Sequence, residues 1–196
     1  MSTFSARRKF MAPSLLLPLL AAAPSTFAAA QPKPAGKILV AYFSRSGNTR
    51  VIAGQIHRTY DAPLFEIEPA RAYPEDYLQT VAQARQERDD GVKPALKAKV
   101  TDLARYETIF LGFPIWGETA PPMIRSFLAA HDFHGKTIIP FITHGGFGTG
   151  DSLKVMAAHA PGAQIVDQRL VMQADQERAT MDKVNDWLGK LKKVQA

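Results

Sequence analysis

A short polar loop near residue 46 has the side chains and the spacing of an anion-binding turn. Its six residues are Ser44, Arg45, Ser46, Gly47, Asn48 and Thr49. Backbone N–H groups of a tight turn at the start of a helix attract phosphate, and hydroxyl side chains can complete such a site without a lysine. We therefore predict a phosphate cradle here, with Gly47 supplying the turn. The alternative interpretation is an ordinary turn or helix cap, which Ser, Gly and Asn also form.

Two further loops could face the same ligand. The first contains Pro114, Ile115, Trp116 and Gly117, and the second contains His144, Gly145, Gly146, Phe147 and Gly148. The flat indole of Trp116 would stack on a planar ring, although a tryptophan beside a strand end is also common core filling. The glycines would let the backbone approach a ligand closely, unless they only make the loop flexible. His144 could contact the ligand or cap its own loop.

Apolar runs predict the strands that position these loops. Residues 38–43, 109–111 and 138–142 are continuously apolar apart from one proline, which is typical of strands buried on both faces of a parallel sheet. Residues 64–67 and 165–171 alternate more, so we expect them toward the edges of the sheet. Each of the three polar loops follows one of the continuous runs.

Helical patterns lie between the predicted strands. One helix is expected to begin at Pro121 and Pro122, where proline is tolerated in the first turn. Another is expected near the C-terminus, where Val184, Leu188 and Leu191 recur on one helical face. Five strands alternating with helices predict an α/β domain with helices on both faces of the sheet. Ligands of such sheets bind beyond the carboxyl ends of the strands, where the three loops lie.

In the order and content of its loops, the chain resembles the flavodoxin family. Residues 44–49 match the phosphate loop of that family, residues 114–117 its second flavin loop, and residues 143–148 its third. The resemblance runs from about Lys37 to Leu191. It implies a flavodoxin-like, doubly wound sheet of five parallel strands in the order 2-1-3-4-5. It also implies non-covalently bound FMN as the cofactor, the three loops as its binding residues, and electron transfer as the function.

Two features depart from the family pattern. A related branch usually has a second bulky aromatic and a small polar residue after the tryptophan, whereas this chain has Gly117 and Glu118. An inward-facing Glu118 would oppose a negatively charged reduced flavin, and an outward-facing one would not. Many carrier flavodoxins are strongly acidic, whereas this chain has a formal charge of +6 and stays mildly basic without Arg7, Arg8 and Lys9. Docking to the usual basic partners is therefore in question.

The first thirty residues have the pattern of an export signal. Arg7, Arg8 and Lys9 precede an uncharged run rich in Leu and Ala, which ends in an Ala-Ala-Ala segment at residues 28–30. The paired arginines resemble a twin-arginine signal, and an ordinary Sec signal or an uncleaved anchor are the alternatives. We predict a signal peptide at residues 1–30, a linker at 31–36 and one flavodoxin-like domain at 37–196. The expected location is periplasmic or otherwise exported, with membrane contact only during export.

Composition excludes several classes of site. The chain has no cysteine, which removes disulfides, thiolate nucleophiles and iron–sulfur clusters. Its five histidines lack metal-binding spacing, so we predict no metal site. Basic residues are scattered, which does not favour nucleic-acid binding. Ser44 and Arg50 have the spacing of a tyrosine phosphatase loop, but a serine cannot replace its thiolate. Serine-hydrolase, Rossmann and P-loop nucleotide motifs are missing.

The remaining alternatives concern the use of the flavin. The chain could be an electron carrier, or an FMN-dependent enzyme that passes electrons from NAD(P)H to a quinone. Export weakens the enzyme interpretation, because reduced nicotinamides are not expected outside the cytoplasm. We expect a redox partner protein or a quinone-type acceptor, and we assign no catalytic residue because the flavin would supply the chemistry. A flavin-free binding module on the same scaffold is the third interpretation.

Overall fold

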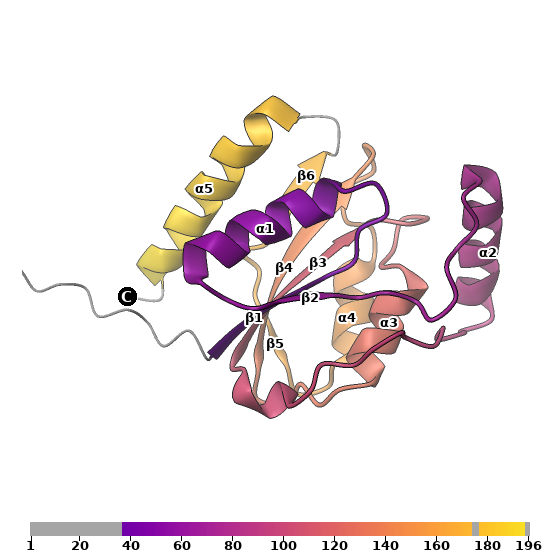
Figure 1. Ribbon diagram of the computed structural model, residues 1–196, viewed down its shortest axis with the longest axis horizontal. Coiled ribbons are helices and arrows are strands. Elements are labelled where there is room, and N and C mark those ends of the chain that lie inside the picture. Colours follow the sequence, from indigo (N-terminus) through magenta and orange to yellow (C-terminus); the bar gives the residue numbers. More distant parts are fainter. Residues whose placement is uncertain (1–36, 174–176, 195–196) are drawn as a thin grey trace, which may run out of the picture. The chain divides into compact units, whose positions relative to one another are not determined.

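A parallel sheet forms the centre of the computed structural model, which describes residues 37–173 and 177–194. The four longer strands are β1 (Ile38–Tyr42), β3 (Thr108–Pro114), β4 (Thr137–His144) and β6 (Leu170–Gln173), and the shorter two are β2 (Leu64–Glu66) and β5 (Gln164–Ile165). The strand order is β2-β1-β3-β4-β5, and β6 also pairs with β4 (Figure 1). Every pairing is parallel. The predicted order 2-1-3-4-5 is confirmed.

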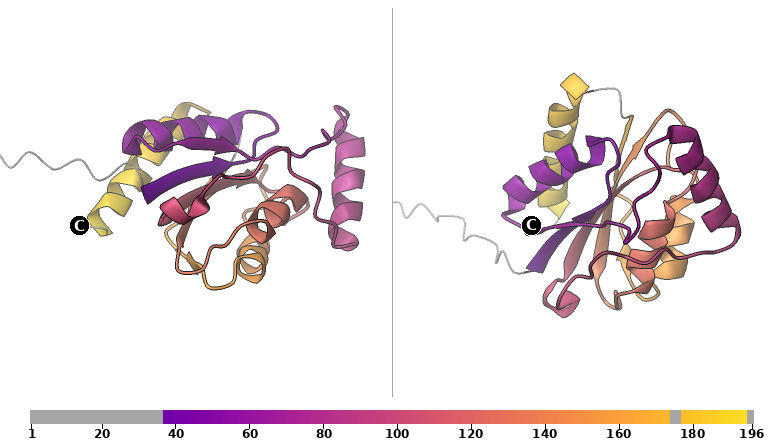
Figure 2. Two further views of the ribbon diagram at one scale, coloured as in Figure 1. Left: turned by 60° about the horizontal axis from the view of Figure 1, so that its bottom comes forward. Right: turned by 45° about the vertical axis from the view of Figure 1, so that its right-hand side comes forward.

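Helices cover both faces of the sheet, as predicted. On one face lie α1 (Asn48–Tyr60) and α5 (Glu177–Val194), and on the other lie α3 (Pro122–Ala129) and α4 (Ser152–His159) (Figure 2). Alternate residues of each strand point to opposite faces, so side chains of the sheet contribute to two hydrophobic cores. One core joins Leu111 and Phe113 to Phe127, and the other joins Phe141 to Ile52. The predicted helix starts at Pro121 and Pro122 and the C-terminal helix are both found.

The fifth predicted strand differs from the structure. Residues 165–171 form parts of two strands, because β5 pairs with the beginning of β4 and β6 pairs with its end. Pro140 lies between these two stretches. The Ile138 carbonyl accepts from the Val166 N–H, so the backbone polar groups of even-numbered β4 residues point toward β5 and β6. Pro140 is one of these residues, and it has no N–H to donate. The Trp187 indole N–H instead donates to the Gln168 carbonyl at 2.7 Å, where the chain leaves the ladder.

One helix stands apart from the two layers. Helix α2 (Tyr77–Asp89) lies beyond the carboxyl ends of the strands, away from the helices that cover the sheet (Figures 1 and 2). The Asp76 side chain caps it by accepting from the Gln79 N–H at 2.8 Å. Only Thr80 and Ala84 of α2 are buried. The helix therefore forms a wall over the edge where the three polar loops emerge.

The predicted signal peptide and linker lie outside the described residues. No helix in the described ranges combines the length and the apolar character needed to cross a bilayer.

Candidate functional site

The three predicted loops meet at the carboxyl end of the sheet. They follow β1, β3 and β4, which are neighbours in the strand order. Backbone hydrogen bonds hold them in register: Phe43 N–H donates to the Gly112 carbonyl at 2.9 Å, and Ile115 N–H donates to the Thr143 carbonyl at 2.8 Å. Three loops that are far apart along the chain thus share one site.

The first loop leaves the start of α1 open to an anion. Gly47 adopts a left-handed conformation with φ 96°, and its N–H donates to Ser44 Oγ at 3.1 Å. Within the described residues no side chain caps α1, and its first turn has no acidic residue. The contrast is α2, which Asp76 caps. The positive end of the α1 dipole and its first N–H groups therefore lack the usual side-chain acceptor, which favours a bound anion.

A buried hydroxyl pair joins the first loop to β4. Thr49 Oγ1 lies 2.9 Å from Thr143 Oγ1. The two residues are 1% and 3% exposed, so the pair is buried. Each hydroxyl has one hydrogen and can also accept. If Thr143 donates, the Thr49 hydroxyl keeps its hydrogen for a ligand at the loop.

Arg45 is turned toward α2. Its guanidinium donates to the Glu75 carbonyl at 2.9 Å and lies 5.7 Å from the centre of the Tyr77 ring. Ser46 is exposed beside it. Arg45 therefore fixes the start of the α2 wall.

The second loop is a tight turn with unusual backbone angles. Trp116 N–H donates to the Thr119 carbonyl at 3.0 Å, and Thr119 N–H donates back at 3.3 Å. Gly117 and Glu118 between them have φ values of 57° and 61°. Two consecutive left-handed residues suit glycine or asparagine, and a glutamate costs about 1–2 kcal/mol there. Strained residues of this kind concentrate at functional sites.

Two aromatic rings hold Trp116 in place. Phe43 and Tyr73 meet its ring edge to face, with centroids 5.2 and 5.1 Å away and interplanar angles of 84° and 86°. The Tyr73 hydroxyl donates to the Glu87 carboxylate on α2. Burial, and then the adjacent Glu87, raise the pKa of Tyr73 far above its ordinary value, so this hydroxyl keeps its proton. The indole is therefore oriented before any ligand arrives.

A cavity of about 610 Å³ opens between the second loop and α2. The first two loops and the start of α3 contribute nine lining residues: Arg45, Ser46, Pro114, Ile115, Trp116, Gly117, Glu118, Thr119 and Pro122. Helix α2 contributes six more: Tyr77, Thr80, Val81, Ala84, Arg85 and Arg88. The volume lies within the range of about 300–1,000 Å³ that is typical of small-molecule sites. Trp116 also borders a smaller cavity of about 260 Å³, so the indole separates two spaces.

The third loop lies beside the cavity and supports the second loop. The His144 Nδ1 accepts from the Gly146 N–H at 3.0 Å, so this histidine caps its own loop. Phe147 is 76% exposed. Asp151 N–H donates to the Glu118 carbonyl at 3.1 Å, and a Cβ on Gly150 would lie 1.7 Å from that oxygen. The two loops are thus packed backbone against backbone, which requires a glycine at position 150.

The α2 wall is the part of the site that sequence reasoning missed. Nothing in the sequence placed α2 opposite Trp116. Among the described residues, no group of three or more metal-ligating side chains is found.

Comparison with known proteins identifies the family. The sequence model of the flavodoxin family matches residues 37–191. The chain belongs to the flavodoxin family. No curated protein matches it.

Solved structures agree with this family assignment. A candidate flavoprotein from Bacteroides uniformis is 33% identical to this flavodoxin-family chain, with a TM-score of 0.67, and the match covers 79% of this chain and 98% of that one. Another from Bacteroides eggerthii is 31% identical, with a TM-score of 0.61 and coverages of 76% and 98%. A Lactobacillus acidophilus flavoprotein in complex with FMN is 21% identical, with a TM-score of 0.59 and coverages of 74% and 97%; it supports the fold.

Proposed function

We propose that this flavodoxin-family protein binds FMN non-covalently and transfers electrons through it. The observation that carries the proposal is the start of α1, where Gly47 provides no side-chain cap and hydroxyl side chains lie nearby. This helix start adjoins the cavity that Trp116 lines. FMN is the cofactor expected of the family, and the Lactobacillus acidophilus relative is described in complex with it. Bound FMN would supply the redox chemistry, so the chain itself needs no acid, base or nucleophile.

The first loop fits the phosphate of FMN. The N–H groups at the start of α1 would donate to its oxygens, and the dipole of a 13-residue helix would favour its negative charge. Ser46 and Thr49 would add hydroxyl donors. Gly47 admits the loop conformation at a φ that other residues rarely adopt.

The second loop fits the flavin ring. Trp116 offers a flat, half-buried indole on the cavity wall, and Phe43 and Tyr73 keep it from rotating. Ile115 and Pro114 extend the apolar surface beside it. These residues would orient the ring and exclude water from part of it.

The electron donor and acceptor are proposed from the sequence. The signal-like residues 1–30 support export to the periplasm, where a redox partner protein or a quinone-type acceptor is the expected counterpart. An FMN-dependent NAD(P)H or quinone oxidoreductase is the alternative. Redox titration separates the two, since a carrier stabilises a one-electron state and a two-electron enzyme does not.

The proposal is tested by titrating the purified mature protein with FMN while flavin fluorescence and visible absorbance are followed. Replacing Ser46 and Thr49 together by alanine should weaken FMN binding, because each hydrogen bond to a charged acceptor contributes about 1.5–3 kcal/mol. Riboflavin, which lacks the phosphate, should be affected far less. Thr101→Ala, at an exposed turn, is the control variant. A protein that stays colourless and ignores FMN would refute the proposal and leave a binding module.

A further inference from the structure

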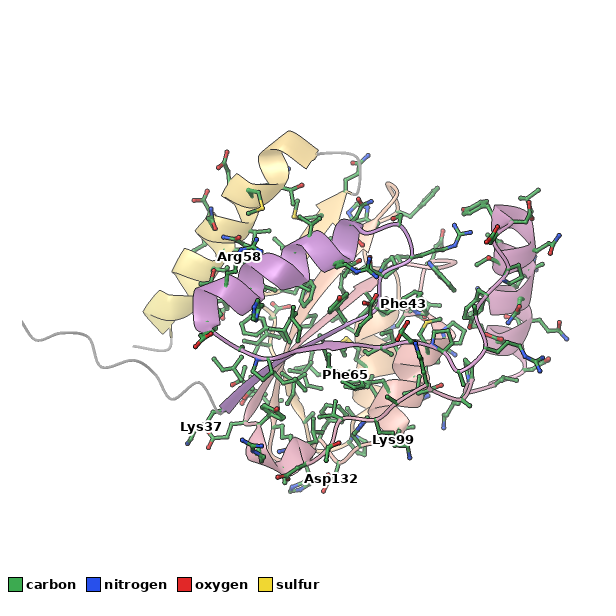
Figure 3. All side chains as sticks on the ribbon, in the orientation of Figure 1. Lys37, Phe43, Arg58, Phe65, Lys99 and Asp132 are labelled. Carbon is green, nitrogen blue, oxygen red and sulfur yellow. The ribbon has the colours of Figure 1, made fainter. Side chains whose placement is uncertain are left out.

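A tyrosine lies behind Trp116, outside the cavity that the flavin would occupy. The Tyr73 ring contacts the Trp116 indole edge to face, with ring centroids 5.1 Å apart. Tyr73 borders the smaller cavity of about 260 Å³, whereas Trp116 borders both cavities. Phe43 packs on the same indole and lies at the end of β1 that faces α2 (Figure 3). Trp116 therefore stands between Tyr73 and the proposed position of the flavin.

The Tyr73 hydroxyl has a proton acceptor on α2. It donates to one oxygen of the Glu87 carboxylate, and the other oxygen accepts from the Gln83 amide at 2.8 Å. Tyr73 and Glu87 are both half-buried. Burial, and then Glu87, raise the pKa of Tyr73, so the phenol is neutral before any reaction. The two hydrogen bonds fix the carboxylate with one oxygen directed at the phenolic proton.

This arrangement favours the transfer of one electron together with one proton. A phenol that loses an electron becomes a strong acid, so its oxidation is easy only when a base within hydrogen-bond reach takes the proton. Glu87 meets that condition for Tyr73. An indole, in contrast, can lose an electron and keep its N–H proton. The other tryptophan, Trp187, packs edge to face on Phe110, which has no phenolic proton to give.

We propose that Tyr73 and Glu87 form an electron and proton relay that restores Trp116 after its indole has lost one electron to an oxidant in the cavity. One electron passes from Tyr73 to the oxidised indole, and the phenolic proton passes to Glu87. The products are a neutral Trp116, a neutral Tyr73 radical and a protonated Glu87, and the oxidant has gained one electron. The oxidant is a strong one-electron acceptor, namely light-excited flavin, and for that identity alone the inference rests on the proposed function.

The test illuminates the FMN-loaded mature protein and records its radicals by electron paramagnetic resonance after rapid freezing. We expect a tyrosyl signal in the unmodified chain. Tyr73→Phe keeps a ring against Trp116 but has no phenolic proton, so the tyrosyl signal should be lost. Mass spectrometry after prolonged illumination should then show faster accumulation of oxidised Trp116, because the indole is no longer restored.

Glu87→Gln separates proton transfer from packing. The amide oxygen can still accept from the Tyr73 hydroxyl and hold the ring, but an amide is a very poor base. Transient absorption should show the tyrosyl radical forming more slowly by a factor of about 100 or more, as for the loss of a positioned proton acceptor. The step should also slow in D₂O in the unmodified chain. A role for Glu87 in packing alone predicts no such change in rate.

Tyr106→Phe is the matched control, because it removes a phenol at the other end of the sheet. Tyr106 precedes Glu107, whose N–H donates to the carbonyl of Lys37 at the start of β1 (Figure 3). This variant should keep both the tyrosyl signal and its rate of formation.

A tyrosyl signal that persists in Tyr73→Phe, a rate that Glu87→Gln leaves unchanged, or no tyrosyl signal in the unmodified chain would overturn the inference. The proposed function fails differently, through the absence of FMN binding. In that case photogenerated tris(bipyridine)ruthenium(III), added to the flavin-free mature protein, serves as the oxidant. The same three variants then still report whether Tyr73 restores Trp116.

Discussion

The buried hydroxyl pair of Thr49 and Thr143 allows folding and cofactor binding to be separated. The two oxygens lie 2.9 Å apart in a nearly inaccessible position. Valine has almost the shape of threonine without the hydroxyl. Thr49→Val, Thr143→Val and the double variant therefore remove one or both partners of this hydrogen bond with little change in packing.

The two single variants should be less stable than the double variant. An unpaired buried hydroxyl costs about 1–3 kcal/mol, whereas replacing both partners by apolar groups of the same shape is nearly neutral. We therefore expect each single variant to lose about 1–3 kcal/mol of unfolding free energy and the double variant to lose much less. Urea unfolding of the flavin-free mature protein measures the three values.

FMN affinity should rank the same variants differently. Thr49→Val and the double variant lose a donor to the phosphate and should bind FMN about 10- to 150-fold more weakly, which corresponds to about 1.5–3 kcal/mol. Thr143→Val keeps the Thr49 hydroxyl and should bind FMN with a much smaller change. Riboflavin binding should be similar in all of them, because riboflavin has no phosphate.

Two results would refute this reasoning. A double variant as unstable as the sum of the single variants would show that the hydroxyl pair does not couple the loop to β4. Unchanged FMN affinity in Thr49→Val would show that the Thr49 hydroxyl does not reach the phosphate.

Three further perturbations test other parts of the structure. Gly150→Ala should lower the unfolding free energy by about 1–3 kcal/mol, because its Cβ would strike the Glu118 carbonyl; an unchanged thermal midpoint would contradict that packing. Burial lowers the pKa of His131, whose Nε2 accepts from the Val100 N–H, so stability should be greatest above about pH 6.5 and fall as the pH drops toward the lower folded-state pKa. His131→Gln should flatten that dependence in pH-resolved unfolding. Trp116→Ala should weaken FMN binding and reduce fluorescence quenching; no change in either would make Trp116 a core residue only.

Much of the fold was predictable because a parallel sheet imposes a simple pattern. Strands buried on both faces must be apolar throughout, which is why residues 38–43 and 138–142 identified β1 and β4. The division of the fifth strand was less visible. Its cause lies in the neighbouring strand β4, where Pro140 has no N–H to donate toward residues 165–171. The sequence of residues 165–171 by itself therefore could not reveal the division.

The candidate site was predictable where its residues follow strands and not where they lie on α2. The three loops could be placed because the carboxyl ends of adjacent parallel strands meet. Helix α2 buries only Thr80 and Ala84, so it has no apolar stripe from which its orientation could be read. Contacts made by single long side chains, such as Arg88 with Gly117, fix its position. Periodicity does not encode such contacts.

The thin attachment of α2 has a consequence for how this protein could change. Its two buried residues are small, and its links to the second loop run through side chains: Arg88 reaches the Gly117 carbonyl, and Glu87 accepts from Tyr73, which packs on Trp116. Substitutions on the cavity face of α2 would therefore alter the ligand that the cavity accepts while leaving the sheet, the start of α1 and the Trp116 turn intact. A library confined to the cavity-lining positions Val81, Ala84 and Arg85 would spare Glu87 and Arg88, whose side chains contact Tyr73 and Gly117.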